Sequence, residues 1–242
     1  MTRRPPGAAA LALGALLAWP AASGRAEVPR PPPLAQEGNA CLPTSAAMAL
    51  HSLGVPTTPR DVARNLPFHP DGTDFFDLQE ELARREVASL VFVGGPAEIA
   101  AAVEAGVPVV AAVHGGETKH AVLIWGARRG EGEGHLRYID PRGGVAHEVP
   151  FEDFARIQYA RQLLVVWTRA EPAEERLTAS GFPLEAARAV NARFRAEALV
   201  LRAARHAEPN RQALELLRRA VGEDPSWEVA RDRLRAVEDA VR

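Results

Sequence analysis

Residues 36–54 read QEGNACLPTSAAMALHSLG and contain Cys41, the only cysteine of the chain. Proline fits the first turn of a helix without losing a hydrogen bond, so Pro43 places a helix start at Cys41. The apolar residues that follow predict a buried helix up to Leu53, which Gly54 stops. Unpaired N–H groups at a helix start favour the thiolate form of a cysteine. Cys41 is therefore a candidate nucleophile.

Downstream of this helix, the apolar pattern changes from helical to strand-like. Pro59–Asn65 and Asp77–Arg85 predict short helices. Further segments are predicted as strands at Ala88–Val93, Val107–Val113, His120–Trp125, Leu136–Ile139 and Leu163–Trp167, with one helix at Ala97–Glu104. Helices followed by sequential strands predict an α+β fold, in which N-terminal helices pack on an antiparallel sheet.

The N-terminus has the three-part layout of a secretory signal peptide over residues 1–26. Arg3 and Arg4 form its basic start, and the apolar run that follows is shorter than the ~20 residues that a spanning helix needs. The two arginines also permit a twin-arginine export signal. We therefore expect a periplasmic or secreted protein with no membrane span in the mature chain, which begins with a proline-rich lead-in at 27–33.

Composition excludes several classes of protein. The formal net charge is −2, and 28 of the 29 basic residues are arginine. Charges of both signs are interspersed along the chain, so we expect no nucleic-acid partner. Histidine and cysteine do not occur in pairs at zinc spacing, and we expect neither a metal nor a cofactor.

A single cysteine is unusual in an exported protein, because oxidising compartments favour cysteines in pairs. Three explanations are open for Cys41: a reactive thiol, a disulfide bridge to another protein, or a buried cysteine without chemistry. A reactive thiol requires a base to accept its proton. The chain offers seven histidines for that role.

Two of the histidines, His114 and His120, flank the turn GGETK between apolar strands. We favour His120 as the base because it begins the strand HAVLIWG, and a rigid element holds a catalytic group better than a loop does. The remaining histidines are expected to be surface or local-structure residues: His51, His69, His135, His147 and His206.

A carboxylate and an amide complete the candidate site. Asp140, in YIDPRGG, ends the strand that should lie beside the start of the His120 strand, so its carboxylate can accept the imidazole N–H and orient the ring. An aspartate that merely opens a turn is the alternative. Gln36 precedes Cys41 by five residues, and its amide can join the Cys41 N–H in binding an oxyanion.

Taken together, QEGNACLPTSAAMAL, HAVLIWG and DPRGG resemble the peptidase C39-like group of papain-like cysteine peptidases, over roughly Leu34–Trp167. The resemblance implies a papain-like domain at 34–170 that acts on a peptide or protein substrate. It also implies Cys41 as nucleophile, His120 as general base and acid, Asp140 as orienting residue and Gln36 in the oxyanion hole.

The pattern departs from the family at Leu42, where glycine usually follows the nucleophile. A side chain at this position is expected to narrow the approach to the thiol.

Residues 171–242 predict a helical tail with helices at Pro183–Ala207, Asn210–Val221 and Trp227–Val241. Within the second helix, small and apolar residues and a following proline fall at the spacing of a tetratricopeptide repeat. At most about one and a half repeats fit, so a helical hairpin packed on the domain is an equal alternative.

Two functions follow from these patterns. The first is an exported thiol hydrolase that cleaves a peptide or isopeptide bond by a Cys-His-Asp mechanism, which also permits acyl transfer to an amine. The second is a catalytically inactive papain-like module that recruits a protein partner through its C-terminal helices.

Overall fold

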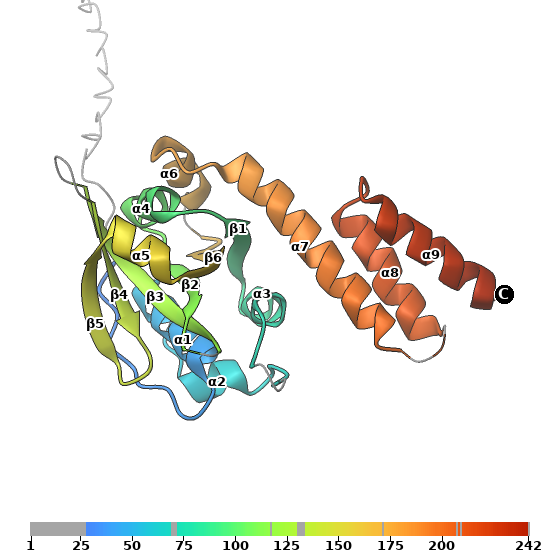
Figure 1. Ribbon diagram of the computed structural model, residues 1–242, viewed down its shortest axis with the longest axis horizontal. Coiled ribbons are helices and arrows are strands. Elements are labelled where there is room, and N and C mark those ends of the chain that lie inside the picture. The colour runs from blue at the N-terminus through green and yellow to red at the C-terminus, as the bar shows by residue number, and fades with distance from the viewer. Residues whose placement is uncertain are drawn as a thin grey trace, which may run out of the picture.

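The computed structural model describes residues 28–68, 72–116, 118–129, 134–170, 172–206, 208 and 210–241. The predicted signal peptide and His69 lie outside the described residues. The described chain forms one antiparallel sheet with helices on both faces, followed by a tail of helices that extends to one side (Figure 1). The α+β fold predicted from the sequence is confirmed. No helix in the described ranges is long and apolar enough to cross a membrane.

The sheet has six strands in the order β1-β6-β2-β3-β4-β5, and every neighbouring pair is antiparallel. Their bounds are β1 Val87–Val93, β2 Val109–His114, β3 Lys119–Arg128, β4 His135–Asp140, β5 Val145–Pro150 and β6 Gln158–Thr168. The five predicted strands are all present. The sequence did not predict β5, because this edge strand carries no continuous buried stripe.

The two faces of the sheet carry separate apolar cores. On one face pack α1 (Cys41–Ser52), α2 (Pro59–Ala63) and α3 (Phe75–Arg84). The other face is covered by α4 (Pro96–Glu104), α5 (Phe151–Ile157) and α6 (Ala173–Ala179). The tail consists of α7 (Leu184–Ala204), α8 (Arg211–Glu223) and α9 (Glu228–Val241).

The start of α1 lies where β3 and β4 separate. Pairing between these strands reaches no further than Leu123 opposite Ile139, so the first residues of β3 have no partner on that side. The Ser45 hydroxyl donates a hydrogen bond to the Ala121 carbonyl at 3.1 Å. This bond holds the N-terminal half of α1, which begins with Cys41, against the strand that carries His120.

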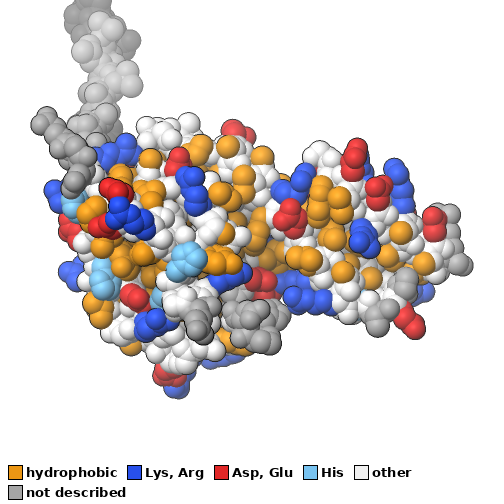
Figure 2. All heavy atoms as spheres, in the orientation of Figure 1, with side chains coloured by type: hydrophobic (Ala, Val, Ile, Leu, Met, Phe, Trp, Pro, Cys, Tyr) orange, Lys and Arg blue, Asp and Glu red, His pale blue; other side chains and the backbone are white. Residues whose placement is uncertain are grey.

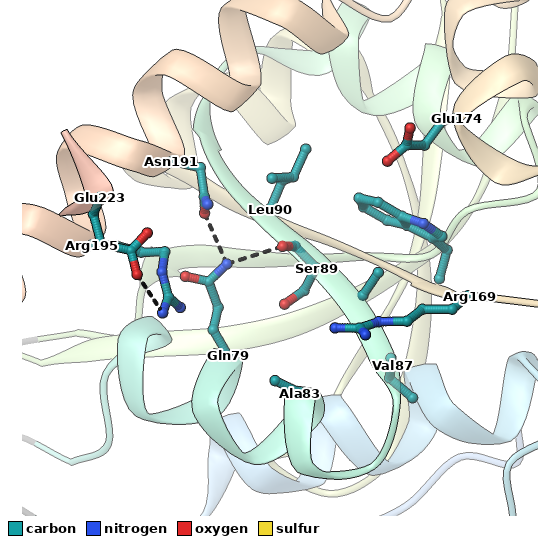
Figure 3. A pocket seen from close by; sticks show the side chains of 12 residues that line it. Gln79, Ala83, Val87, Ser89, Leu90, Arg169, Glu174, Asn191, Arg195 and Glu223 are labelled. Carbon is teal, nitrogen blue, oxygen red and sulfur yellow. Dashed lines mark hydrogen bonds and ion pairs between the residues drawn. The ribbon is translucent and has the colours of Figure 1, made fainter. Parts of the chain in front are cut away.

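Side chains from two helices protect the free edge of β1. The Val91 N–H donates to Asn191 Oδ1 at 2.8 Å. Gln79 Nε2 donates to the Ser89 carbonyl at 3.1 Å and to Asn191 Oδ1 at 2.8 Å (Figure 3). An unpaired edge strand can pair with another chain. Gln79 from α3 and Asn191 from α7 therefore bind polar groups that a further strand would otherwise bind.

The tail packs on the N-terminal domain through Phe76 of α3. This ring is fully buried among tail residues that include Ala196, Leu199 and Ala220. The guanidinium groups of Arg195 and Arg202 lie 5.2 and 4.1 Å from the ring centroid. A residue of the domain thus completes the core of the tail, which agrees with helices packed on the domain.

Charges are mixed over the surface. Basic and acidic side chains alternate over the face shown in Figure 2, on the domain as well as on the tail. Such a mixture provides no continuous basic stripe for a nucleic-acid backbone on that face.

Candidate active site

Cys41 is the first residue of α1, and its thiol is free and partly exposed. The residue before it, Ala40, supplies no side-chain hydrogen bond to cap the helix. The first N–H groups of a helix have no carbonyl partner within it. At this helix start, those groups are available to the Cys41 sulfur and to negative charge that forms next to it.

His120 and Asp140 form a hydrogen-bonded pair in which the histidine is buried and the Asp140 side chain is 28% exposed. The His120 side chain is 4% exposed, and its Nε2 lies 2.7 Å from Asp140 Oδ1. The Arg142 N–H donates to the same oxygen at 2.7 Å and holds the carboxylate in place. Because the carboxylate accepts the Nε2 proton, Nδ1 is the nitrogen left for the thiol, and the imidazole is hydrogen-bonded to Cys41.

The pKa values of this triad shift in the directions that a thiolate–imidazolium pair requires. Burial raises the pKa of Cys41, but hydrogen bonds from His120 and the Ala121 N–H outweigh it and lower the pKa overall. Burial lowers the pKa of His120, but its bonds to Cys41 and Asp140 raise it overall. For Asp140, burial raises the pKa, whereas His120 and the Arg142 N–H bring it below the ordinary value. These shifts favour transfer of the thiol proton to the imidazole.

Gly115, in the turn between β2 and β3, lies next to His120 and helps to position it. The Gly115 N–H donates to the Thr118 carbonyl at 2.9 Å, and its carbonyl accepts from the Arg142 guanidinium at 3.3 Å. A Cβ on residue 115 would lie 2.6 Å from the His120 Cβ, which is closer than real Cβ contacts. Glycine at this position therefore leaves room for the base of the His120 side chain.

We expect Gly115→Ala to displace His120 and to slow alkylation of Cys41 by iodoacetamide at pH 6 by about tenfold, because even a small misplacement weakens the hydrogen bond between ring and thiol. Stopped-flow or mass-spectrometric rates measure this. Gly116→Ala is the matched control: its φ of +84° strains a side chain, but no atom lies within 4 Å of the added Cβ. Equal rates for the two variants would contradict this account of Gly115.

Gln36 lies in the loop before α1 and makes no described hydrogen bond to the triad. Its Nε2 donates to the Gly38 carbonyl at 2.5 Å, and its Oε1 is buried without a partner within the described chain. Gly38 has a φ of +55°, which folds the loop back so that its carbonyl meets the amide. The Gln36 N–H donates to the Pro141 carbonyl at 2.7 Å and ties this loop to the residue after Asp140.

Leu42 does not stand over the thiol. Its side chain is 4% exposed and packs in the α1 core cluster, which includes Met48 and Leu50. The expectation that this side chain narrows the approach to Cys41 is therefore wrong, because the helical turn directs it into the core.

The other described histidines have separate contacts. His51 Nε2 lies 2.7 Å from the Thr57 carbonyl, and His147 stacks on Tyr138 with ring centroids 4.8 Å apart. His114 contacts the edge of the Tyr159 ring. Within the described ranges, none of these three histidines forms a hydrogen bond with Cys41, His120 or Asp140.

Sequence reasoning missed the residues that position the triad. Ser45, Gly115, Arg142 and the backbone of Ala121 act through main-chain contacts that depend on strand register. The Gly115–Gly116 pair in the turn before His120 is the sequence signal for this close approach.

Two cavities, of about 380 and 540 Å³, lie beside α7 and contain none of the triad. The chemistry of Cys41, His120 and Asp140, and not the depth of a cavity, identifies the candidate site. The described residues contain no cluster of three or more histidine, cysteine, aspartate or glutamate side chains that is able to hold a metal ion.

A family model described as "Peptidase_C39 like family" matches residues 28–163, which include all four candidate site residues and end before α6. No curated protein sequence matches the chain.

Solved structures of similar fold include a double glycine motif protease from an AMS/PCAT transporter in complex with the leader peptide. It has 17% sequence identity and a TM-score of 0.44, with 60% of this chain and 94% of that chain covered. The peptidase domain of Streptococcus ComA has 14% identity and a TM-score of 0.47 over 55% and 94%. An N-terminal peptidase C39 like domain from Vibrio parahaemolyticus has 14% identity and a TM-score of 0.43 over 55% and 100%.

Proposed function

The chain belongs to the Peptidase_C39 like family, and from this membership we propose that it is an exported thiol hydrolase that cleaves a peptide or isopeptide bond. The observation that carries the proposal is the series of hydrogen bonds from Cys41 through His120 to Asp140 at the start of α1. The signal-peptide layout of residues 1–26 supports export to the periplasm or medium.

The reaction begins with attack of the Cys41 thiolate on the carbonyl carbon of the substrate. The carbonyl oxygen gains negative charge, which the unpaired N–H groups at the start of α1 stabilise. Gln36 is proposed as the second donor to this oxygen, after its amide turns away from the Gly38 carbonyl. The tetrahedral intermediate then collapses to a thioester with Cys41.

Proton transfer falls to His120. The imidazolium donates its Nδ1 proton to the leaving amine as the bond to nitrogen breaks, and the neutral ring then takes a proton from the water that attacks the thioester. Asp140 keeps the Nε2 proton on the far side of the ring throughout, so the other nitrogen faces the sulfur. Hydrolysis of the thioester releases the acid and restores the thiolate.

Exposed apolar residues on the tail favour a second role, the recruitment of a protein partner. Leu201 of α7 is 64% exposed and Val229 of α9 is 49% exposed. If Cys41 is unreactive and the domain is inactive, recruitment of a partner is the function that we propose for the whole chain. The two roles are separated by the reactivity of Cys41.

The test is incubation of the protein with a mixture of peptides and isopeptide-linked peptides, followed by mass spectrometry. Wild type should produce new termini, and Cys41→Ala should produce none. Hydroxylamine added to the reaction should trap the acyl group as a hydroxamate, because an amine competes with water for the thioester. The same fragments from Cys41→Ala, or no fragments from wild type, would overturn the proposal.

A further inference from the structure

Lys119 is the first residue of β3 and directly precedes His120. It is also the single lysine in a chain whose other 28 basic residues are arginine. Its side chain is exposed, and its ammonium nitrogen lies 5.0 Å from the centroid of the Tyr159 ring. A cation over an aromatic face at this distance is attracted by the ring. The ring thus restrains a positive charge one residue from the candidate base.

The strand register places this charge on the face of the sheet that carries α1. Lys119 pairs with His114 across the β2–β3 ladder, so both side chains lie on one face. The His114 ring contacts the edge of the Tyr159 ring, with centroids 5.2 Å apart. Tyr159 packs against the same apolar cluster as Cys41. Ala121, two residues further along β3 and on the same face, supplies the backbone N–H that hydrogen-bonds the Cys41 sulfur. Lys119 therefore lies on the Cys41 side of the sheet, with His114 and Tyr159 beside it.

A bulge in β6 presents the Tyr159 ring. Register changes from Val113 opposite Gln158 to Ala111 opposite Leu163, so residues 159–162 lie opposite Ala112 alone. Within the bulge, Ala160 and Arg161 have φ values of 49° and 53°. Left-handed backbone at non-glycine residues is uncommon, and it concentrates at functional sites. The chain keeps this strained turn directly after Tyr159.

Lys119 has no carboxylate partner within the described part of the chain, whereas many of the arginines form ion pairs. Arg142, from the turn between β4 and β5, donates from its guanidinium to the Gly115 carbonyl in the β2–β3 turn, so a second cation lies near His120. An ammonium group that has no carboxylate partner among the described residues is suited to a carboxylate that arrives with a ligand.

We infer that Lys119, Tyr159 and His114 form a subsite that binds a carboxylate of the substrate beside the bond to be cleaved. The inference deepens the proposed function and rests on it. Lys119 supplies the charge, Tyr159 restrains the ammonium, and His114 packs against the Tyr159 ring in a T-shaped arrangement. The carboxylate belongs either to an aspartate or glutamate side chain or to the C-terminus of the peptide.

Two alkylating reagents of similar size test the charge at the site. Iodoacetate carries a carboxylate and iodoacetamide is neutral, so the ratio of their rates with Cys41 reports the local potential. Lys119→Gln should lower this ratio by about three- to tenfold, the size that Coulomb's law gives for one charge acting through water at about 3–6 Å from the carboxylate of the reagent. Lys119→Arg should keep the ratio close to wild type.

Arg128→Gln is the matched control. Arg128 lies at the far end of the same strand, is exposed, and pairs with Glu148 at 3.3 Å, so this variant loses the same formal charge away from the site. Its ratio should equal that of wild type. A ratio in Lys119→Gln that matches Arg128→Gln would overturn the inference.

The iodoacetamide rate by itself reports the activated thiol, so failure of the proposed function is visible separately from failure of the subsite. A retained iodoacetamide rate in Lys119→Gln also shows that the variant is folded. Competition of alkylation by peptides then separates the two sources of carboxylate. Protection by a C-terminally amidated acidic peptide assigns the side chain, and protection only by a free C-terminus assigns the terminal carboxylate.

Discussion

Replacing His120 with alanine is expected to slow alkylation of Cys41 by iodoacetamide at pH 6 by roughly 10²-fold. Without the imidazole, burial still raises the pKa of the thiol, while its strongest lowering contact is lost. A thiol that titrates near the ordinary value of ~8.5 holds well under a hundredth of its population as thiolate at pH 6. Rates measured from pH 4 to 10 in both proteins give the two titration curves.

The Cys41–His120 pair also predicts a bell-shaped pH profile for hydrolysis. Activity should rise as pH increases through the lowered pKa of Cys41, where the thiolate forms, and fall as pH increases through the raised pKa of His120, where the imidazolium that protonates the leaving amine is lost. His51→Ala is the matched control, since that ring bonds the Thr57 carbonyl. Superimposable profiles for wild type and His120→Ala would refute the ion pair.

Replacing Phe76 with alanine is expected to lower the free energy of unfolding by about 3–5 kcal/mol, the range found when a buried aromatic ring is removed from a core. The ring is fully buried between α3 and the tail, and two arginine side chains lie over it. Loss of the ring leaves a cavity between the N-terminal domain and the helical tail. Urea unfolding followed by circular dichroism measures the change.

Phe68→Ala provides the control for this variant, because that ring is 52% exposed and its removal should change stability by about 0.5 kcal/mol or less. Limited proteolysis adds a second readout: cleavage between α6 and α7 should accelerate in Phe76→Ala alone. Equal stability of the two variants would show that the tail does not depend on Phe76.

The sequence was sufficient for the parts of the fold that local signals specify. Pro43 and Gly54 bracket α1 within one or two residues, and apolar runs marked five strands. The sequence also predicted that His120 and Asp140 lie together, since the start of one strand lies beside the end of the next in an antiparallel pair. Their hydrogen bonding is described by the structure, and their catalytic roles stay a prediction.

Other elements differ from what the sequence predicted. The first part of β6 escaped prediction because Ala160 and Arg161 interrupt the strand pattern. Helix α3 begins at Phe75, two residues before the predicted start, because the Asp74 side chain accepts the Asp77 N–H at 2.8 Å and caps it. Phe76 therefore lay outside the predicted helix, and its burial depends on a tail more than 100 residues away.

The cover over β1 has a consequence for how the chain is made. The Val91 N–H bonds Asn191, a residue 100 positions further along the chain. This N–H at the edge of β1 therefore has no partner until the ribosome has synthesised the intervening segment. Nascent chains that stall before α7 would expose this edge to one another. Association of incomplete chains through β1 is therefore expected in the interval between synthesis of β6 and synthesis of α7.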